Sequence, residues 1–99
     1  MNDCEKTEKL LKALADKSRL KILQCLQEGI CNPGEIAGRL DRHRSTIEKH
    51  LRVLRAANIV EKVPSLNETG QLSIQYRIRE NAIGLLETIQ EACRNAKLV

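Results

Sequence analysis

Apolar residues recur at helical spacing through the first part of the chain and alternate with polar residues later. From about Asn2 to Ala15 the spacing of three and four predicts an amphipathic helix. A second, more apolar and mostly buried helix follows, which Asp16 or Ser18 can cap and Gly29 ends. The first stripe comprises Cys4, Thr7, Leu10, Leu11 and Leu14, and the second Leu20, Ile22, Leu23, Cys25 and Leu26.

The next stretch indicates two helices joined by a short polar turn. Asn32 can cap the third helix, with Pro33 at its first position and Glu35 at capping-box spacing. After the turn DRHR, a fourth helix is expected at about 44–57. Helical geometry gives it an inward apolar face and an outward ridge of small and cationic residues. The inward face holds Ile47, Leu51 and Leu54; the ridge holds Ser45, Lys49, Arg52 and Ala56.

After Asn58 the pattern changes from helical to alternating. Ile59–Val63 predicts a short strand, and Leu72–Ile78 alternates strictly between apolar and polar residues. The turn-forming residues PSLNETG between them predict a loop, and so a β-hairpin. A hairpin after a helix-turn-helix is the winged-helix arrangement. We therefore expect residues 1–99 to form one winged helix-turn-helix domain, mostly α with a small β-hairpin, in the order α-α-α-α-β-β-α.

The last helix, from about Asn81 to Lys97, carries a seam of small and aliphatic residues: Ala82, Leu86, Ile89, Cys93 and Ala96. Because the seam lies outside the helix-turn-helix, its simplest interpretation is a surface between two copies, completed by the first helix. The alternative is a helix docked on its own domain. The residues expected to pair two copies are Thr7, Leu11, Leu86, Ile89 and Cys93.

Positive charge is concentrated in the helical hairpin. Of 17 cations and 13 anions in the chain, six cations and two anions lie between Arg39 and Arg55, so eleven of each remain elsewhere and cancel. Such a patch favours a phosphate-bearing partner, which on an exposed helix ridge is double-stranded DNA. The alternative is a merely solvated basic face. The candidate DNA-binding residues are Arg44, Ser45, Thr46, Lys49, His50, Arg52 and Lys62.

The remaining composition excludes several classes of function. Tyr76 is the only aromatic residue, whereas single-strand and RNA binding usually require aromatic platforms. No apolar run could cross a bilayer and the N-terminal stretch is charged, so we expect no membrane association and a cytoplasmic protein. In that compartment the four cysteines are expected to be thiols. With no Gly-rich phosphate loop, paired carboxylates or activated nucleophile recognisable, we expect neither an enzyme nor a cofactor.

Two segments resemble the ArsR/SmtB-type winged-helix repressors. LKALADKSRLKILQCL (Leu11–Leu26) is similar to the family's second-helix signature, and STIEKHLRVLRAANIV (Ser45–Val60) to its recognition helix and the entry to the wing. The resemblance implies a cytoplasmic homodimer that represses transcription from an inverted-repeat operator until an effector weakens binding. Its recognition helices would enter successive major grooves about 34 Å apart. Neither the operator nor the effector follows from it.

The chain departs from the family pattern at the DNA-reading helices. Arg42 stands where the family's turn is usually apolar, and Glu48 replaces a small polar residue of the recognition helix. An acid beside phosphates is unfavourable unless it reads a cytosine amine or caps the helix locally, and Ser45-x-x-Glu48 has capping-box spacing. The wing tip carries Glu68 and no arginine, the nearest cation being Lys62, so any wing contact should be weak.

The family's metal-sensing positions are not filled. Asn32 and Gly34 occupy the positions of its Cys-x-Cys pair, Cys31 stands beside them without a second cysteine, and the last helix contains no Asp or His. A metal-sensing role is therefore not carried over. One thiol hypothesis remains: Cys4 and Cys93, across a dimer, form a disulfide or bind a soft ion. The simpler interpretation is that both are small apolar residues in a core.

The same fold also serves protein recognition, so the alternative function is a protein-protein interaction module whose basic hairpin meets an acidic surface. The two functions differ in their response to salt and competitor. A DNA reader loses affinity steeply with salt yet keeps its preference for one duplex over bulk DNA.

Overall fold

A computed structural model describes residues 2–96 of the chain. Over this range the elements follow the predicted order α-α-α-α-β-β-α, with the two strands paired antiparallel, which confirms the fold class. They are α1 (Asp3–Leu14), α2 (Lys17–Gln27), α3 (Pro33–Leu40), α4 (Arg44–Ala56), β1 (Val60–Leu66), β2 (Leu72–Ile78) and α5 (Glu80–Asn95). The predicted end of the last helix at Lys97 lies outside the described residues.

Short polar side chains start the first three helices. Asn2 accepts a hydrogen bond from the Glu5 amide, and Asp16, rather than Ser18, accepts one from the Arg19 amide. Asn32 accepts from the amides of Gly34 and Glu35. These bonds satisfy amides that have no partner within the helix, so local chemistry determines where the helices begin.

The hairpin is longer than the sequence indicates. β1 continues through Pro64 to Leu66, so the predicted loop PSLNETG is wrong in its first residues and the turn is confined to residues 67–71. Pro64 pairs with Ile74 in the ladder. Proline suggests a turn, but both strands of a two-stranded sheet are edge strands, where a missing amide hydrogen is tolerated.

The core lies where α2, α3 and the inner face of α4 meet the base of the hairpin. Ile22, Ile36 and Leu51 are each 0% exposed there, and Tyr76 closes the core from β2. Its amide donates to the Cys31 carbonyl at 2.9 Å, which ties the hairpin to the segment before α3. The expectation that Leu20 is buried is wrong, because 47% of this residue is exposed.

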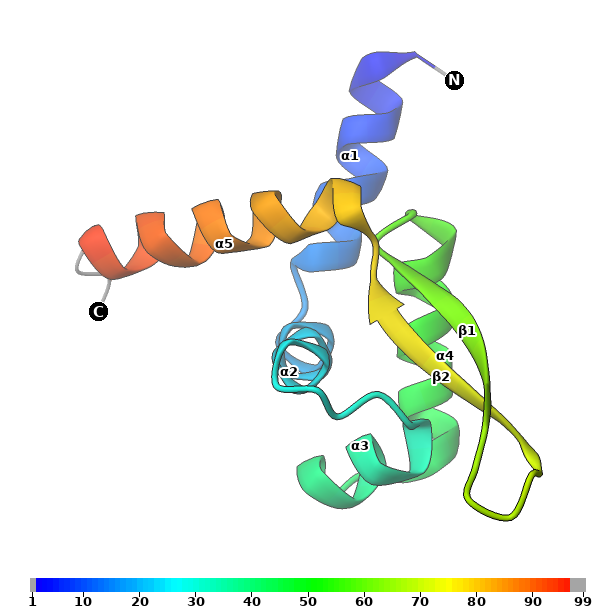
Figure 1. Cartoon of the computed structure of the whole chain (residues 1–99). Helices are drawn as coiled ribbons and strands as arrows, with labels where there is room; N and C mark the ends of the chain where they lie inside the picture. Colours follow the sequence, from blue (N-terminus) through cyan, green and yellow to red (C-terminus); the bar gives the residue numbers. More distant parts are fainter. Residues whose placement is uncertain (1, 97–99) are drawn as a thin grey trace.

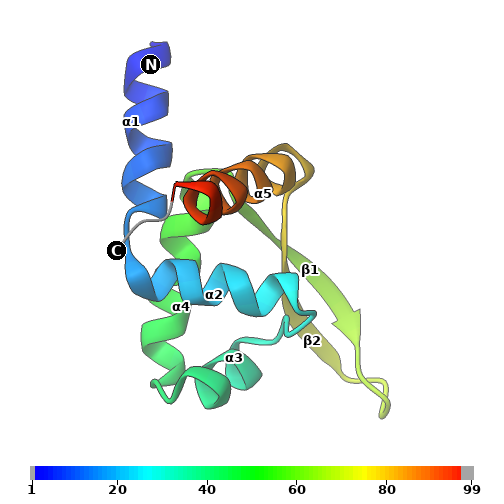
Figure 2. The same ribbon diagram turned by 90° about the vertical axis from the view of Figure 1, so that its left-hand side faces the viewer.

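The two ends of the molecule differ (Figures 1 and 2). α1 and α5 extend from one end, while α3, the start of α4 and the tip of the hairpin lie at the other, with α4 running between them. The predicted pairing helices and the predicted DNA-reading surface are therefore at different ends of the domain. None of the helices in residues 2–96 is both long and apolar enough to cross a bilayer.

Candidate nucleic-acid interface

Helix α4 is held from one side only. Ile47, Leu51 and Leu54 are 0–1% exposed and pack into the core, as their spacing predicted. The ridge on the opposite face is exposed along its length. The ridge residues are Ser45, Lys49, Arg52 and Ala56. A helix fixed along one face presents the other with little freedom to tilt.

The cations of the helical hairpin differ in their partners. Arg39 pairs with Glu28 on α2 at 3.2 Å, and Arg44 pairs with Glu48 one turn along α4 at 3.4 Å. Within residues 2–96, Lys49 and Arg52 form no ion pair with any acid, so no described carboxylate offsets the charge of the ridge.

Glu48 has a local role, but not the predicted one. The residue that caps α4 is His43, whose side chain makes no capping hydrogen bond, so a Ser45–Glu48 capping box does not form. The carboxylate instead faces Arg44. This contact pairs the one acid of α4 with Arg44 on the flank of the helix and not with a cation of the ridge.

Two other candidate residues lie on the flank that faces α2. Thr46 and His50 are both half-buried. His50 Nδ1 lies 3.3 Å from Nη1 of Arg19 in α2. The structure thus separates these side chains from the ridge, and for His50 it provides an internal contact that the sequence gave no reason to expect.

The wing tip is organised by one asparagine. Oδ1 of Asn67 accepts from the amides of Thr69 and Gln71, and Gly70 turns the chain at φ +81°. Such side-chain turns tighten a hairpin end. Residues 67–71 contain no cation, and the exposed Lys62 lies farther back on β1.

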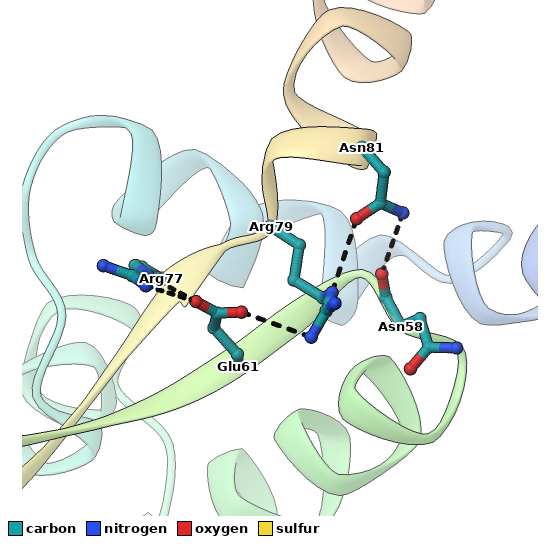
Figure 3. Close-up of polar contacts among 5 residues, drawn as sticks. All are labelled: Asn58, Glu61, Arg77, Arg79 and Asn81. Carbon is teal, nitrogen blue, oxygen red and sulfur yellow. Dashed lines mark hydrogen bonds and ion pairs between the residues drawn. The ribbon is translucent and has the colours of Figure 1, made fainter.

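The base of the wing carries a polar network (Figure 3). Glu61 on β1 accepts from Arg77 Nε at 2.6 Å and from Arg79 Nη1 at 3.2 Å. Asn81 at the start of α5 accepts from Arg79 and donates to the Asn58 carbonyl just after α4. The network therefore joins the end of α4, both strands and the start of α5. A ladder register would have paired Glu61 with Arg77, but the sequence alone does not give that register.

The residues expected to pair two copies fall into two groups. Thr7, Leu11 and Cys93 are exposed, Leu11 by 54%, and Ile89 is half-buried. Leu86 is only 3% exposed and belongs to the core of its own chain, which corrects its assignment to a pairing surface. It lies on the inner side of α5 because the helix docks through Ala82 and Leu86.

The four cysteines are free thiols. Burial raises the pKa of the Cys25 and Cys31 thiols, which disfavours the thiolate, the nucleophilic and metal-binding form. Cys4 and Cys93 are exposed, near the tips of α1 and α5, which point to different sides of one chain (Figure 1). In the part that the structure describes, no three or more His, Cys, Asp or Glu side chains are grouped to hold a metal ion.

The chain is similar to known helix-turn-helix proteins. The family model for a helix-turn-helix domain matches residues 14–63. Over 64 residues the chain is 41% identical to the HTH-type transcriptional regulator CmtR of Mycobacterium tuberculosis, a match that covers 61% of this chain and 54% of that protein. The chain thus spans about half the length of the curated relatives it matches.

Solved structures extend the similarity over more of the chain. The cadmium metal-sensor CMTR from Mycobacterium tuberculosis is 34% identical, with a TM-score of 0.63 over 84% of this chain and 83% of that chain. HlyU from Vibrio cholerae is 26% identical, with a TM-score of 0.73 over 93% and 97%.

A third structure has the same fold. It is the homodimeric winged helix-turn-helix DNA-binding domain of Mb0332 from Mycobacterium bovis, a possible ArsR-family transcriptional regulator, with 24% identity and a TM-score of 0.79 over 97% of this chain and 90% of that chain. The helix-turn-helix match covers half of the chain, and CMTR is similar along most of it. This chain therefore belongs to the ArsR/SmtB family of winged helix-turn-helix proteins.

Proposed function

We propose that the chain is a sequence-specific, double-stranded-DNA-binding transcriptional regulator that acts in the cytoplasm as a dimeric repressor. It would read an inverted-repeat operator with α4. The observation that carries the proposal is the exposed ridge of α4, on which Lys49 and Arg52 have no acidic partner within residues 2–96 while the opposite face is fully buried.

The ridge suits a major groove because its side chains differ in size. Ser45 and Ala56 are short and allow close approach, whereas Lys49 and Arg52 are long enough to reach base edges or phosphates. Arg44 holds Glu48 on the flank, which reduces repulsion between that carboxylate and the phosphates. Arg44 on the flank of α4 and the exposed Lys62 on β1 would then contact the DNA backbone.

Exposed apolar residues support pairing of two copies. Leu11 on α1 and Ile83 and Leu85 on α5 are 54%, 42% and 36% exposed in the single chain, at the end of the molecule away from the wing tip. Burying these side chains against a second copy would remove apolar surface from water. Two α4 ridges would then face DNA together, as inverted half-sites require.

The effector is a separate question. The similar CMTR is a cadmium sensor, but the donors needed for such a site are not grouped among residues 2–96, so no metal step is proposed. The other candidate is an effector that acts on the thiols of Cys4 and Cys93, because both are exposed on helices that are proposed to pair. Operator binding measured before and after thiol oxidation tests it; unchanged affinity in the oxidised protein would rule it out.

Salt and competitor distinguish DNA reading from protein binding. An operator selected from random duplexes should be bound in preference to bulk DNA, with affinity falling steeply as salt rises. Lys49→Ala or Arg52→Ala should weaken operator binding by about 1–3 kcal/mol if base edges are contacted. If the contacts are to phosphates only, affinity should fall evenly for all sequences with a smaller salt slope. A protein that ignores every duplex at low salt would contradict the proposal.

A further inference from the structure

Arg19, in the first turn of α2, contacts two other helices, α1 and α4, at once. Its Nε donates to the Ala13 carbonyl at 2.6 Å and its Nη2 to the Lys12 carbonyl at 3.1 Å, both at the end of α1. Its Nη1 lies 3.3 Å from Nδ1 of His50 on α4. The side chain is only 16% exposed, so these contacts are partly shielded from water.

Arg19 donates hydrogen bonds to two carbonyls at the end of α1. The last carbonyls of a helix have no amide partner within it, and α1 ends at Leu14. A guanidinium presents several donors in one rigid plane, so it can bind two carbonyls of one helix and an acceptor on another. A lysine has no such fork.

Two neighbours hold the guanidinium in this position. Asp16 caps α2 by accepting from the Arg19 amide at 3.0 Å, and its other oxygen lies 3.8 Å from Nη1. Nδ1 of His50 faces Nη1, and in the tautomer that carries its proton on Nε2 it accepts a hydrogen bond from Arg19. The result is a direct polar link from the end of α1 to the middle of α4.

We infer that Arg19 is the positioning residue that sets the placement of the recognition helix α4 relative to α1. The inference rests on the proposed function, in which α1 helps to pair two copies and α4 reads DNA. A rigid link between these helices would fix the distance between the two α4 ridges of a dimer. Arg19 would therefore determine which spacing of operator half-sites is accepted, without touching DNA.

Operators of altered spacing test this role. Binding is measured to the preferred operator and to duplexes whose half-sites lie one or two base pairs closer or farther apart. The wild-type protein should discriminate strongly among them. Arg19→Gln should reduce that discrimination by about tenfold, within the range of coupling energies between contacting residues. Arg19→Lys should behave similarly, because an ammonium group cannot bridge both helices.

Variants of His50 test the same link from α4. His50→Gln keeps an acceptor and should retain spacing discrimination, whereas His50→Leu removes the acceptor and should lose it. Because His50 is half-buried on the helix flank, His50→Leu decides the question even if the Arg19 variants do not fold. Arg39→Gln is the matched control: it removes an arginine and its 3.2 Å ion pair to Glu28, but should weaken binding equally at every spacing.

The outcomes separate the two proposals. A wild-type protein that binds no duplex refutes the proposed function. A wild-type protein that discriminates spacing, together with a folded His50→Leu or Arg19→Gln variant that discriminates equally well, refutes the positioning role alone.

Discussion

Helix α4 and the wing both carry cations, but they present them differently. On the outer ridge of α4, Lys49 and Arg52 are exposed with no acidic partner in residues 2–96. At the base of the wing, Arg77 and Arg79 share the carboxylate of Glu61 at 2.6 and 3.2 Å. One region offers its charge to a partner, whereas the other uses its charge to join β1, β2 and α5.

Geometry explains the difference. Along a helix, side chains meet three or four residues apart, so Glu48 can pair with Arg44 or with Arg52; in the structure it pairs with Arg44, and Arg52 keeps no ion pair among the described residues. In a hairpin, side chains meet across the ladder, and Glu61 stands directly opposite Arg77. The number of cations in a segment therefore says less about DNA binding than the position of the nearest acid.

The largest expected effect concerns the support beneath the ridge. Leu51→Ala removes a side chain that is 0% exposed and leaves a cavity, so the free energy of unfolding should fall by about 2–5 kcal/mol. Val53→Ala, on a residue of the same helix that is 42% exposed, should cost well under that amount. Denaturant unfolding followed by circular dichroism measures both. Equal losses would mean that α4 is not fixed through its inner face.

The next largest effect, on operator binding, compares an arginine of the α4 ridge with one at the base of the wing. Arg52→Ala should weaken operator binding by about 1–3 kcal/mol, while Arg77→Ala, which removes an arginine already paired within the chain, should change it by less than about 1 kcal/mol. Fluorescence anisotropy titrations at one fixed salt concentration measure both. A larger loss for Arg77→Ala would show that the wing base, rather than the ridge, meets DNA.

A third variant leaves the arginines of the wing without their shared acid, like the cations on the α4 ridge. Glu61→Gln removes the carboxylate shared by Arg77 and Arg79, so affinity for any duplex should rise at low salt and the salt slope should become steeper by about one phosphate contact. Stability should fall by about 1 kcal/mol or less, because the pairs are partly exposed. Anisotropy titrations across a salt series measure the slope. An unchanged slope would mean that these arginines cannot reach DNA even when released.

The smallest expected effect is on how the free energy of unfolding depends on pH. The hydrogen bond from the Arg19 amide, helped by the positive charge of the Arg19 guanidinium, holds the pKa of Asp16 below its usual value of about 3.9. A lowered carboxyl pKa stabilises the fold above the unfolded-state value and loses that contribution as pH falls through the folded-state value. Asp16→Asn keeps a capping oxygen, so its unfolding free energy should depend less on pH below about 5 than that of the wild type. Parallel curves would contradict this.

The sequence by itself determined the helices and strands, and the division of α4 into a buried face and an exposed face. The caps at Asp16 and Asn32, the spacing of Ile47, Leu51 and Leu54, and the alternation in Leu72–Ile78 are local signals, because each depends on residues a few positions apart. The same locality places Lys49 and Arg52 on one outward ridge. This much of the fold and of the candidate interface needs no tertiary information.

Only the tertiary structure decided which polar groups are paired. His50 meets Arg19 across 31 positions of sequence, and Glu61 meets Arg79 across 18. It also assigned Leu86 to the core and extended β1 past Pro64. Periodicity gives the face on which a side chain lies, but not the neighbour that face will meet. That neighbour depends on how whole helices and strands pack, which residues distant in the chain determine together.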